Sequence, residues 1–341
     1  METMTDPAPG TPPLPAESAE PAEPAGPAAP AEPAAPAEAA ELAESAATRR
    51  VGVVTVTYSP GETLAALLDS LSAASTVPLA VVISDNGSDD GSVEAAERRP
   101  DVTVVHNGRN LGYGGGVNAG VGALPAGADP VLIVNPDVVL GPGALDELLA
   151  GLRRHPEAGA VGPLITTADG VVYPSARQLP SLGAGAGHAL LGWCWPGNPW
   201  TKTYRQDHAE PVERKAGWLS GSCLLVRRNA FAEIGGFDDD YFMYFEDVDL
   251  GDRLARAGWV SMYVPSASVT HLGGHAASRD RTAMSRAHHA SAYRYLSGRY
   301  ARPWQAPVRW ALRLALAVRA AAASRSAKVA GGAELPDRRP S

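Results

Sequence analysis

The stretch RRVGVVTVTYSP, residues 49–60, decides the fold, because it is where the chain first becomes able to form a buried element. Its β-branched run from Val51 to Thr57 ends in a Ser-Pro turn, which is typical of a strand buried in a parallel sheet. A helix is predicted next from apolar residues at helical spacing: Leu64, Leu67, Leu68 and Leu71. A strand followed by such a helix is the usual beginning of an α/β sheet.

Strands and helices continue to alternate up to residue 140. Strands are predicted within 79–92, 101–107 and 130–140, and helices near 92–98 and within 114–124. This order predicts an α/β fold with a Rossmann-like, mostly parallel central sheet and flanking helices. Ligands of such sheets bind at the carboxyl ends of the strands. Polar residues gather at these ends: Tyr58, Asp85, Asn86, Asn107, Asn135 and Asp137.

The second half of the chain is less regular. Strands are predicted within 159–170 and 221–228, and the connection between them, which holds Trp193, Trp195 and Trp200, is typical of a functional loop. A helix is predicted over 247–257, with Asp249 and Arg253 paired one turn apart. A strand and a turn that contains His271 follow it.

The two ends of the chain differ in charge. Residues 1–48 are rich in Pro, Ala and Glu, with nine acidic and no basic residues, and we expect them to form a disordered tail. Residues 279–341 hold 13 basic and 3 acidic residues, and helices are predicted in this region. We therefore divide the chain into a tail (1–48), a folded domain (49–278) and a basic helical region with a disordered end (279–341). We expect no nucleic-acid partner and leave the oligomeric state open.

The basic region contains a segment, 303–323, that three arginines prevent from spanning a bilayer. Arg302, Arg309 and Arg313 are predicted to share one helical face, which suits a helix lying on an anionic membrane surface. A basic helix packed on its own domain is an equal alternative. The two cysteines, Cys194 and Cys223, are too few for a disulfide framework and fit a reducing compartment.

A glycine-rich segment, residues 110–120, satisfies the dinucleotide-binding pattern. Gly114, Gly116 and Ala119 have its spacing, and Asp137 follows 18 residues after Ala119, so an NAD(P)-dependent oxidoreductase is one hypothesis. Against it, the segment follows the third predicted strand, whereas the pattern belongs after the first. The glycines can also serve only to let a helix approach the sheet. In any of these interpretations their backbone N–H groups can approach a phosphate.

Residues 238–259, DDDYFMYFEDVDLGDRLARAGW, place carboxylates beside aromatic residues. Glu246 and Asp247 directly follow Tyr244 and Phe245, and rings at this position lower the local dielectric. Two neighbouring carboxylates in such surroundings repel each other and have raised pKa values. Crowding of this kind is typical of a catalytic site.

Together the ordered motifs VVTVTYSP, VVISDNGSDDGS, NLGYGGGVNAG, LIVNPDV and GGFDDDYFMYFEDVDLGDRLARAGW resemble the inverting glycosyltransferase family 2. The resemblance covers roughly residues 50–275 and is strongest to its bacterial rhamnosyltransferase-like branch, with the GT-A fold. The sequence has Asn-Pro-Asp where the wider family has Asp-x-Asp. This departure leaves one carboxylate for a metal, so a second ligand is needed elsewhere.

The resemblance implies roles for individual residues. It assigns Mg²⁺ or Mn²⁺ to Asp137 and His271, the pyrimidine ring to Asp85 and Tyr58, and further donor contacts to Asn110, Gly112, Asn118 and Asn135. It makes Asp247 the catalytic base, with Glu246 orienting the site, and Trp218 and Gly221 are expected in the acceptor cleft. The simpler alternatives are a turn histidine at 271, a loop-capping aspartate at 85 and a helix-capping aspartate at 247.

The activity implied is metal-dependent transfer of a sugar with inversion, from dTDP-rhamnose to a lipid-linked saccharide such as N-acetylglucosaminyl-diphospho-polyprenol in cell-wall synthesis. A cytoplasmic enzyme held at the inner face of the membrane fits such an acceptor. UDP-galactofuranose and UDP-N-acetylglucosamine are alternative donors, and a non-catalytic saccharide-binding protein is a further hypothesis. The transferase interpretation requires Asp247 and Asp137 to lie at opposite ends of one bound hexose.

Overall fold

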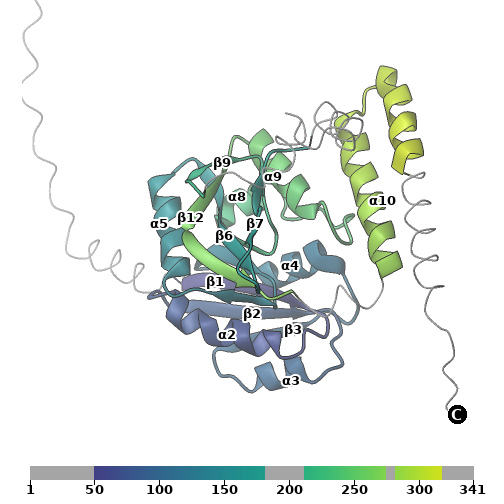
Figure 1. Cartoon of the computed structure of the whole chain (residues 1–341). Helices are drawn as coiled ribbons and strands as arrows, with labels where there is room; N and C mark the ends of the chain where they lie inside the picture. Colours follow the sequence, from purple (N-terminus) through teal and green to yellow (C-terminus); the bar gives the residue numbers. More distant parts are fainter. Residues whose placement is uncertain (1–49, 181–210, 274–280, 317–341) are drawn as a thin grey trace, which may run out of the picture. The chain divides into compact units, whose positions relative to one another are not determined.

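The computed structural model describes residues 50–180, 211–273 and 281–316 (Figure 1). The predicted tail, the tryptophan-containing loop with Cys194, and the end of the basic region lie outside these residues. Cys223 is a free, buried cysteine.

The first half has the predicted alternation. Its elements are β1 (Arg50–Thr57), α2 (Thr63–Ala74), β2 (Leu79–Asp85), α3 (Ser92–Glu97), β3 (Val102–His106), α4 (Gly112–Ala123), β4 (Ala128–Val134) and β5 (Val138–Leu140). The segment 130–140, predicted as one strand, is divided between β4 and β5 because the backbone turns at the Asn-Pro-Asp motif. Asn135 donates its backbone N–H to Ser222 O at 2.9 Å, and Val138 donates to Asn135 O. The motif therefore leaves the sheet and faces the space beyond the strand ends.

The second half is built from shorter elements. These are α5 (Ala144–Arg154), β6 (Ala158–Thr167), β7 (Val172–Tyr173), β8 (Ala176–Arg177), β9 (Arg214–Ala216), β10 (Trp218–Leu219), β11 (Cys223–Val226), α8 (Arg228–Glu233), α9 (Glu246–Arg256), β12 (Val260–His271) and α10 (Arg281–Arg299). A 3₁₀ turn, η2 (Pro303–Gln305), and helical residues 306–316 follow. His271 was predicted in a turn, but it is the last residue of β12 because it pairs with Val138 of β5.

The main sheet has the strand order β3-β2-β1-β4-β11-β6-β12-β5. The strands from β3 to β4 are parallel, whereas β11 runs antiparallel to both β4 and β6. β12 is parallel to β6 and antiparallel to β5. A separate two-stranded ladder joins β8 to β10, with Arg177 opposite Trp218. The sheet thus changes from a parallel half to a mixed half at β11.

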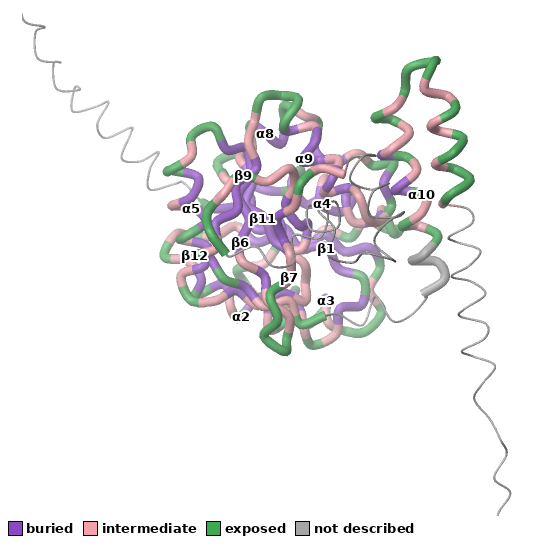
Figure 2. Tube along the Cα trace, turned by 45° about the horizontal axis from the view of Figure 1, so that its top comes forward, coloured by how far each residue is buried: buried purple, intermediate pink, exposed green. Residues whose placement is uncertain are grey.

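Helices cover both faces of the sheet. Leucines of α2 and α5, with Val93 of α3, pack on one face, and residues of α4, α8 and α9 pack on the other. The strands between these layers are buried, as the purple centre of Figure 2 shows. Burial on both faces explains why the first strands read as continuous apolar runs.

The glycines of α4 allow close packing against β1. A Cβ on Gly116 would lie 2.7 Å from Val56, and one on Gly120 would lie 2.5 Å from Val54. Gly114 and Gly116 are buried in the first turns of α4. Helix–sheet approach accounts for these glycines, and the approach of their N–H groups to a phosphate stays a prediction.

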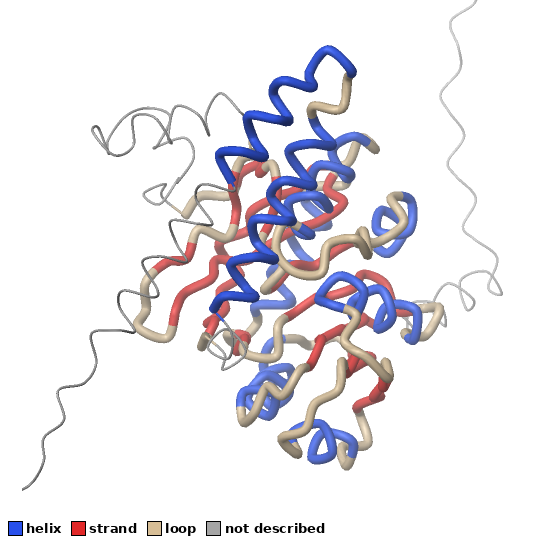
Figure 3. Tube along the Cα trace, turned by 90° about the vertical axis from the view of Figure 1, so that its right-hand side faces the viewer, coloured by secondary structure: helices blue, strands red, loops and turns tan. Residues whose placement is uncertain are grey.

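α10 and residues 306–316 form adjacent helices (Figures 1 and 3). Arg309 and Arg313 lie one turn apart in the helical residues 306–316, as predicted, but Arg302 precedes this helix as the cap of η2. Arg309 donates to Tyr300 O at 2.7 Å and to Arg302 O at 3.0 Å. Apolar side chains are exposed instead: Trp304, Trp310 and Leu314 are 69%, 71% and 67% exposed. Among the described residues, no helix has the length and apolar character needed to cross a bilayer.

Candidate active site

A cavity of about 650 Å³ opens at the ends of β4, β10 and β12 and at the start of α9. Among its lining residues are seven that the sequence singled out: Asn135, Asp137, Trp218, Gly221, Glu246, Asp247 and His271. The required proximity of Asp137 and Asp247 is therefore met, since both line the same cavity. The wall also contains side chains that were not predicted, among them Tyr113, Tyr173, Arg177, Gln178 and His288.

Asp137 and His271 form a pair at one end of the cavity. His271 Nε2 lies 3.0 Å from Asp137 Oδ1, and Leu272 donates its backbone N–H to Asp137 O at 2.9 Å. The β5–β12 ladder creates this contact by placing His271 opposite Val138. Two residues 134 positions apart are thus brought together by strand pairing.

The pair fits a divalent cation in chemistry and spacing. An imidazole nitrogen and a carboxylate oxygen suit Mn²⁺ or Mg²⁺, and adjacent octahedral ligands at about 2.1 Å from a metal lie about 3.0 Å apart. Among the described residues no group of three or more His, Cys, Asp or Glu side chains could hold a metal ion. A cation held by this pair would therefore need oxygen ligands from a substrate or from water.

Glu246 and Asp247 lie on the first turn of α9, whose N-cap is Phe245, so Asp247 is not the helix cap. Asp247 accepts two backbone N–H groups, from Gly221 at 3.1 Å and from Val248 at 2.8 Å. Glu246 is only 8% exposed, and its Oε2 has no hydrogen-bond partner among the described residues. The two neighbouring carboxylates therefore have different surroundings.

These surroundings raise both pKa values, though not for the same reasons. Burial raises the pKa of Glu246, and repulsion from Asp247 raises it further. Burial also raises the pKa of Asp247, while the N–H groups of Gly221 and Val248 oppose the rise. Since donated N–H groups stabilise a carboxylate, Asp247 is the member that ionises first and Glu246 the one that keeps a proton.

The backbone before α9 is strained. Tyr244 and Phe245 have φ values of 67° and 66°, which residues other than glycine rarely adopt. α10 holds this segment, because Ser291 Oγ donates to Met243 O at 2.9 Å. The ring of His288 lies 5.4 Å from that of Tyr244 and 5.6 Å from that of Phe245. The turn that aims the two carboxylates thus depends on a helix more than 40 residues away in the chain.

Asp85 and Tyr58 lie side by side at the ends of β2 and β1, outside the lining of the cavity. Asp85 is buried and accepts hydrogen bonds from Thr57 Oγ1 at 2.8 Å, from Ser88 Oγ at 2.6 Å and from the N–H of Gly87. Although burial acts to raise its pKa, these bonds lower it below the ordinary value. Asp85 therefore has the loop-capping contacts, and its base-binding role stays a prediction. Tyr58 is 50% exposed, and its ring is accessible for stacking.

Three other residues predicted at the donor site have structural contacts. Asn110 Oδ1 accepts the N–H of Gly112 at 2.9 Å, and a Cβ on Gly112 would lie 2.3 Å from Phe242 O. Asn118 donates to Phe237 O and Asp239 Oδ1 and accepts the N–H of Phe237. These contacts hold α4, none of the three residues lines the cavity, and their donor-binding role stays a prediction.

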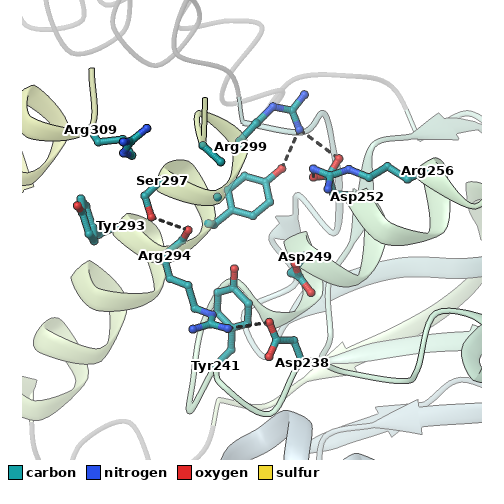
Figure 4. A pocket seen from close by; sticks show the side chains of 13 residues that line it. Asp238, Tyr241, Asp249, Asp252, Arg256, Tyr293, Arg294, Ser297, Arg299 and Arg309 are labelled. Atoms are coloured by element: carbon teal, nitrogen blue, oxygen red, sulfur yellow. Dashed lines mark hydrogen bonds and ion pairs between the residues drawn. The ribbon is translucent and has the colours of Figure 1, made fainter. Parts of the chain in front are cut away.

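A second cavity, of about 630 Å³, lies behind α9 and against α10 (Figure 4). Its carboxylates are paired with arginines: Asp252 with Arg256 at 2.6 Å and Arg299 at 3.1 Å, and Asp249 with Arg253 at 2.6 Å. The last pair is the one predicted from the sequence. The Asp252–Arg299 pair joins α10 to α9, whereas the other two pairs lie within α9.

Comparison with known proteins identifies the family. The sequence model described as "Glycosyltransferase like family 2" matches residues 48–291. The chain is 54% identical over 277 residues to N-acetylglucosaminyl-diphospho-decaprenol L-rhamnosyltransferase of Mycobacterium tuberculosis H37Rv, covering 78% of this chain and 90% of that protein. It is 31% identical over 180 residues to the rhamnosyltransferase WbbL of Escherichia coli K12, covering 51% of this chain and 63% of WbbL.

Among solved structures, the mannosyltransferase PcManGT of Pyrobaculum calidifontis, in complex with GDP-Man and Mn²⁺, is similar with a TM-score of 0.51. The alignment has 18% identity and covers 85% of this chain and 78% of that one, which supports the shared fold alone. The predicted GT-A fold is confirmed, with a mostly parallel central sheet and flanking helices. The chain belongs to glycosyltransferase family 2 and is a glycosyltransferase.

Proposed function

We propose that this enzyme transfers L-rhamnose, with inversion, from dTDP-rhamnose to a lipid-linked saccharide such as N-acetylglucosaminyl-diphospho-polyprenol in cell-wall synthesis. The observation that carries the proposal is the 54% identity, over 90% of its length, to an enzyme named for that transfer. The common cavity of the Asp137–His271 pair and the Glu246–Asp247 pair supports it.

In the proposed reaction Asp247 is the general base. Its carboxylate takes the proton of the acceptor hydroxyl while that oxygen bonds to the anomeric carbon, and the bond to the donor diphosphate breaks. One displacement from the opposite side inverts the anomeric centre. The N–H groups of Gly221 and Val248 hold the carboxylate in place and keep it ionised.

Glu246 orients the acceptor in this proposal. Its protonated carboxyl has an oxygen without a partner among the described residues, so it can hydrogen-bond a sugar hydroxyl inside the cavity. Aromatic residues around it, Tyr244, Phe245 and Trp218, exclude water that would compete with the acceptor.

Asp137 and His271 would hold Mg²⁺ or Mn²⁺, which supplies positive charge against the developing charge of the leaving diphosphate. Asn135 lies beside this pair in the cavity wall and is proposed as a donor contact. Tyr58 and Asp85 are proposed to hold the nucleotide base.

Peripheral attachment to the inner face of the cytoplasmic membrane is part of the proposal. The exposed Trp304, Trp310 and Leu314 form an apolar surface on the basic C-terminal region, and indole rings favour the membrane interface. Flotation with vesicles containing anionic lipid tests this, with Trp304→Ser/Trp310→Ser as the variant. Undiminished flotation of that variant would contradict the assignment. The division into 1–48, 49–278 and 279–341 also remains a proposal.

The transfer itself is tested with purified enzyme, a synthetic N-acetylglucosaminyl-diphospho-lipid and Mg²⁺ or Mn²⁺. With dTDP-rhamnose we expect a product that is heavier than the acceptor by one deoxyhexose. NMR should show that the anomeric configuration of the transferred sugar is inverted relative to the donor. UDP-galactofuranose and UDP-N-acetylglucosamine serve as competing donors. Faster turnover of either would replace the donor assignment, and binding of any donor without turnover would favour the non-catalytic alternative.

A further inference from the structure

Arg177 stands at the end of the cavity that contains Trp218 and the two carboxylates of α9. It is on β8, opposite Trp218 in the two-stranded ladder, and it is the single arginine or lysine among the described residues that line the cavity. Its guanidinium carbon lies 5.6 Å from the centre of the Tyr173 ring and 5.7 Å from that of Trp218. Two aromatic faces therefore fix the plane of the guanidinium.

The hydrogen bonds of Arg177 leave part of this group available. Its Nε donates to Pro174 O at 2.9 Å, and its two Nη atoms have no hydrogen-bond partner within the described residues. Other arginines near the site are engaged differently: Arg253 pairs with Asp249, and Arg214, which also stacks on an aromatic ring, donates to Ala176 O. Arg177 thus lines the cavity with two Nη groups that no other described residue occupies.

The charges of the cavity residues indicate what Arg177 could bind. Asp247, the ionised member of the carboxylate pair, lines the cavity, and in the proposed function it would repel an anionic acceptor unless a cation lay close by. The charge of Arg177 reaches Asp247, because it acts to lower the pKa of that carboxyl. In the proposed function the Asp137–His271 pair serves the donor diphosphate, so the acceptor diphosphate needs another cation.

We propose that Arg177 binds the diphosphate of the lipid-linked acceptor through its Nη atoms. The inference rests on the proposed function, since it assumes a saccharide joined to lipid by a diphosphate. A planar guanidinium can donate two parallel hydrogen bonds to phosphate oxygens. The indole of Trp218 and the ring of Tyr173 fix its orientation. Recognition of the diphosphate would place the first sugar of the acceptor against Asp247.

The donor also carries a diphosphate, and the experiment separates the two sources. We would compare Arg177→Gln with Arg214→Gln, a matched loss of an arginine that stacks on a ring and bonds to β8 but does not line the cavity. The measurements are KM for acceptor, KM for donor, and calorimetric binding of geranyl diphosphate, which has the diphosphate and a prenyl chain but no sugar. Melting temperatures establish that both variants are folded.

For Arg177→Gln we expect the acceptor KM and the geranyl diphosphate Kd to rise at least about tenfold, with the donor KM changed less than about twofold. Arg177→Lys should recover part of the loss, and Arg214→Gln should change neither quantity. An equal rise in donor KM, an unchanged acceptor KM, or no binding of geranyl diphosphate to the wild type overturns the inference. Failure of the wild type to use dTDP-rhamnose would instead contradict the proposed function, and the binding arm would still report on Arg177.

Discussion

The pKa values of buried carboxylates are shifted in opposite directions in the two halves of the molecule. In the parallel half, Asp85 ends a strand and has hydrogen bonds from Thr57 and Ser88, so its pKa is lowered. In the mixed half, Glu246 begins a helix with one oxygen buried and unpartnered, and its pKa is raised together with that of Asp247. Buried carboxylates are therefore fully hydrogen-bonded in one half, whereas in the other Glu246 keeps an oxygen without a partner among the described residues.

The difference follows from where each half obtains its hydrogen-bond partners. The parallel half holds its loops by local hydrogen bonds within a few residues of the strand end. The mixed half assembles its carboxylates from a strained turn that α10 supports through Ser291 and His288. A site held from a distance can leave polar atoms unpaired for a substrate, at a cost in stability.

The largest expected effect is the loss of transfer in Asp247→Asn. An amide cannot accept the hydroxyl proton, so the rate should fall by about 10²- to 10⁴-fold. Asp249→Asn is the control, because Asp249 is paired with Arg253 one turn further along α9. Thermal stabilisation by donor should survive in both variants, and near-normal turnover of Asp247→Asn would remove the base assignment.

The second largest effect is expected from removing one of the two proposed metal ligands. His271→Ala leaves one side chain of the pair, and we expect Mn²⁺-dependent stabilisation by the nucleotide sugar to weaken at least about tenfold in metal concentration. His155→Ala is a suitable control, since His155 follows α5, contacts Glu213 at 2.7 Å and does not line the cavity. Identical Mn²⁺ titrations of the two variants would contradict a metal role for His271.

Asp85→Asn should destabilise the parallel half by about 1–3 kcal/mol, because buried donors lose a charged acceptor. The folded-state pKa is lowered, so the stability from Asp85 is present above its ordinary value of 3.8 and is lost as pH falls through the lower folded value. Urea unfolding of both proteins between pH 7 and pH 3 measures this. A difference that stays constant over this range would show that the charge of Asp85 is not the cause.

Glu246→Gln should have the smallest effect and the opposite sign. The folded-state pKa of Glu246 is raised, so the folded wild type loses stability as pH rises from 4.5 towards the raised value. Removing the ionisable group should stabilise the protein at pH 8 by about 1 kcal/mol, or a few degrees in Tm. A lower Tm at pH 8 would show that Glu246 is satisfied in the folded state.

Much of the fold was predictable because it depends on local pattern. The apolar run at β1 and the leucines of α2 indicate their elements directly, and the order of motifs indicated the family that the comparison then identified. The division of 130–140 at Asn135 was not predictable, because it depends on a backbone bond to Ser222, 87 residues away.

The residues missed at the site share a reason. Tyr113, Arg177 and His288 come from α4, β8 and α10, and no local motif marks them as members of one cavity. Arg177 could have been recognised by its position opposite Trp218. The sequence does not show this position, because it arises from the pairing of β8 with β10. The partners of Asn118 at 237–239 were not predictable for the same reason, since they are distant in sequence.

The sequence alone determined the order of strands and helices, the family, and the residue types available for chemistry, because side-chain periodicity and motif order are properties of neighbouring residues. The tertiary structure decided which of two adjacent carboxylates is held ionised, which glycines serve packing, and which arginine meets the cavity. These outcomes depend on burial and hydrogen-bond partners, and distant segments supply both only after the chain has folded.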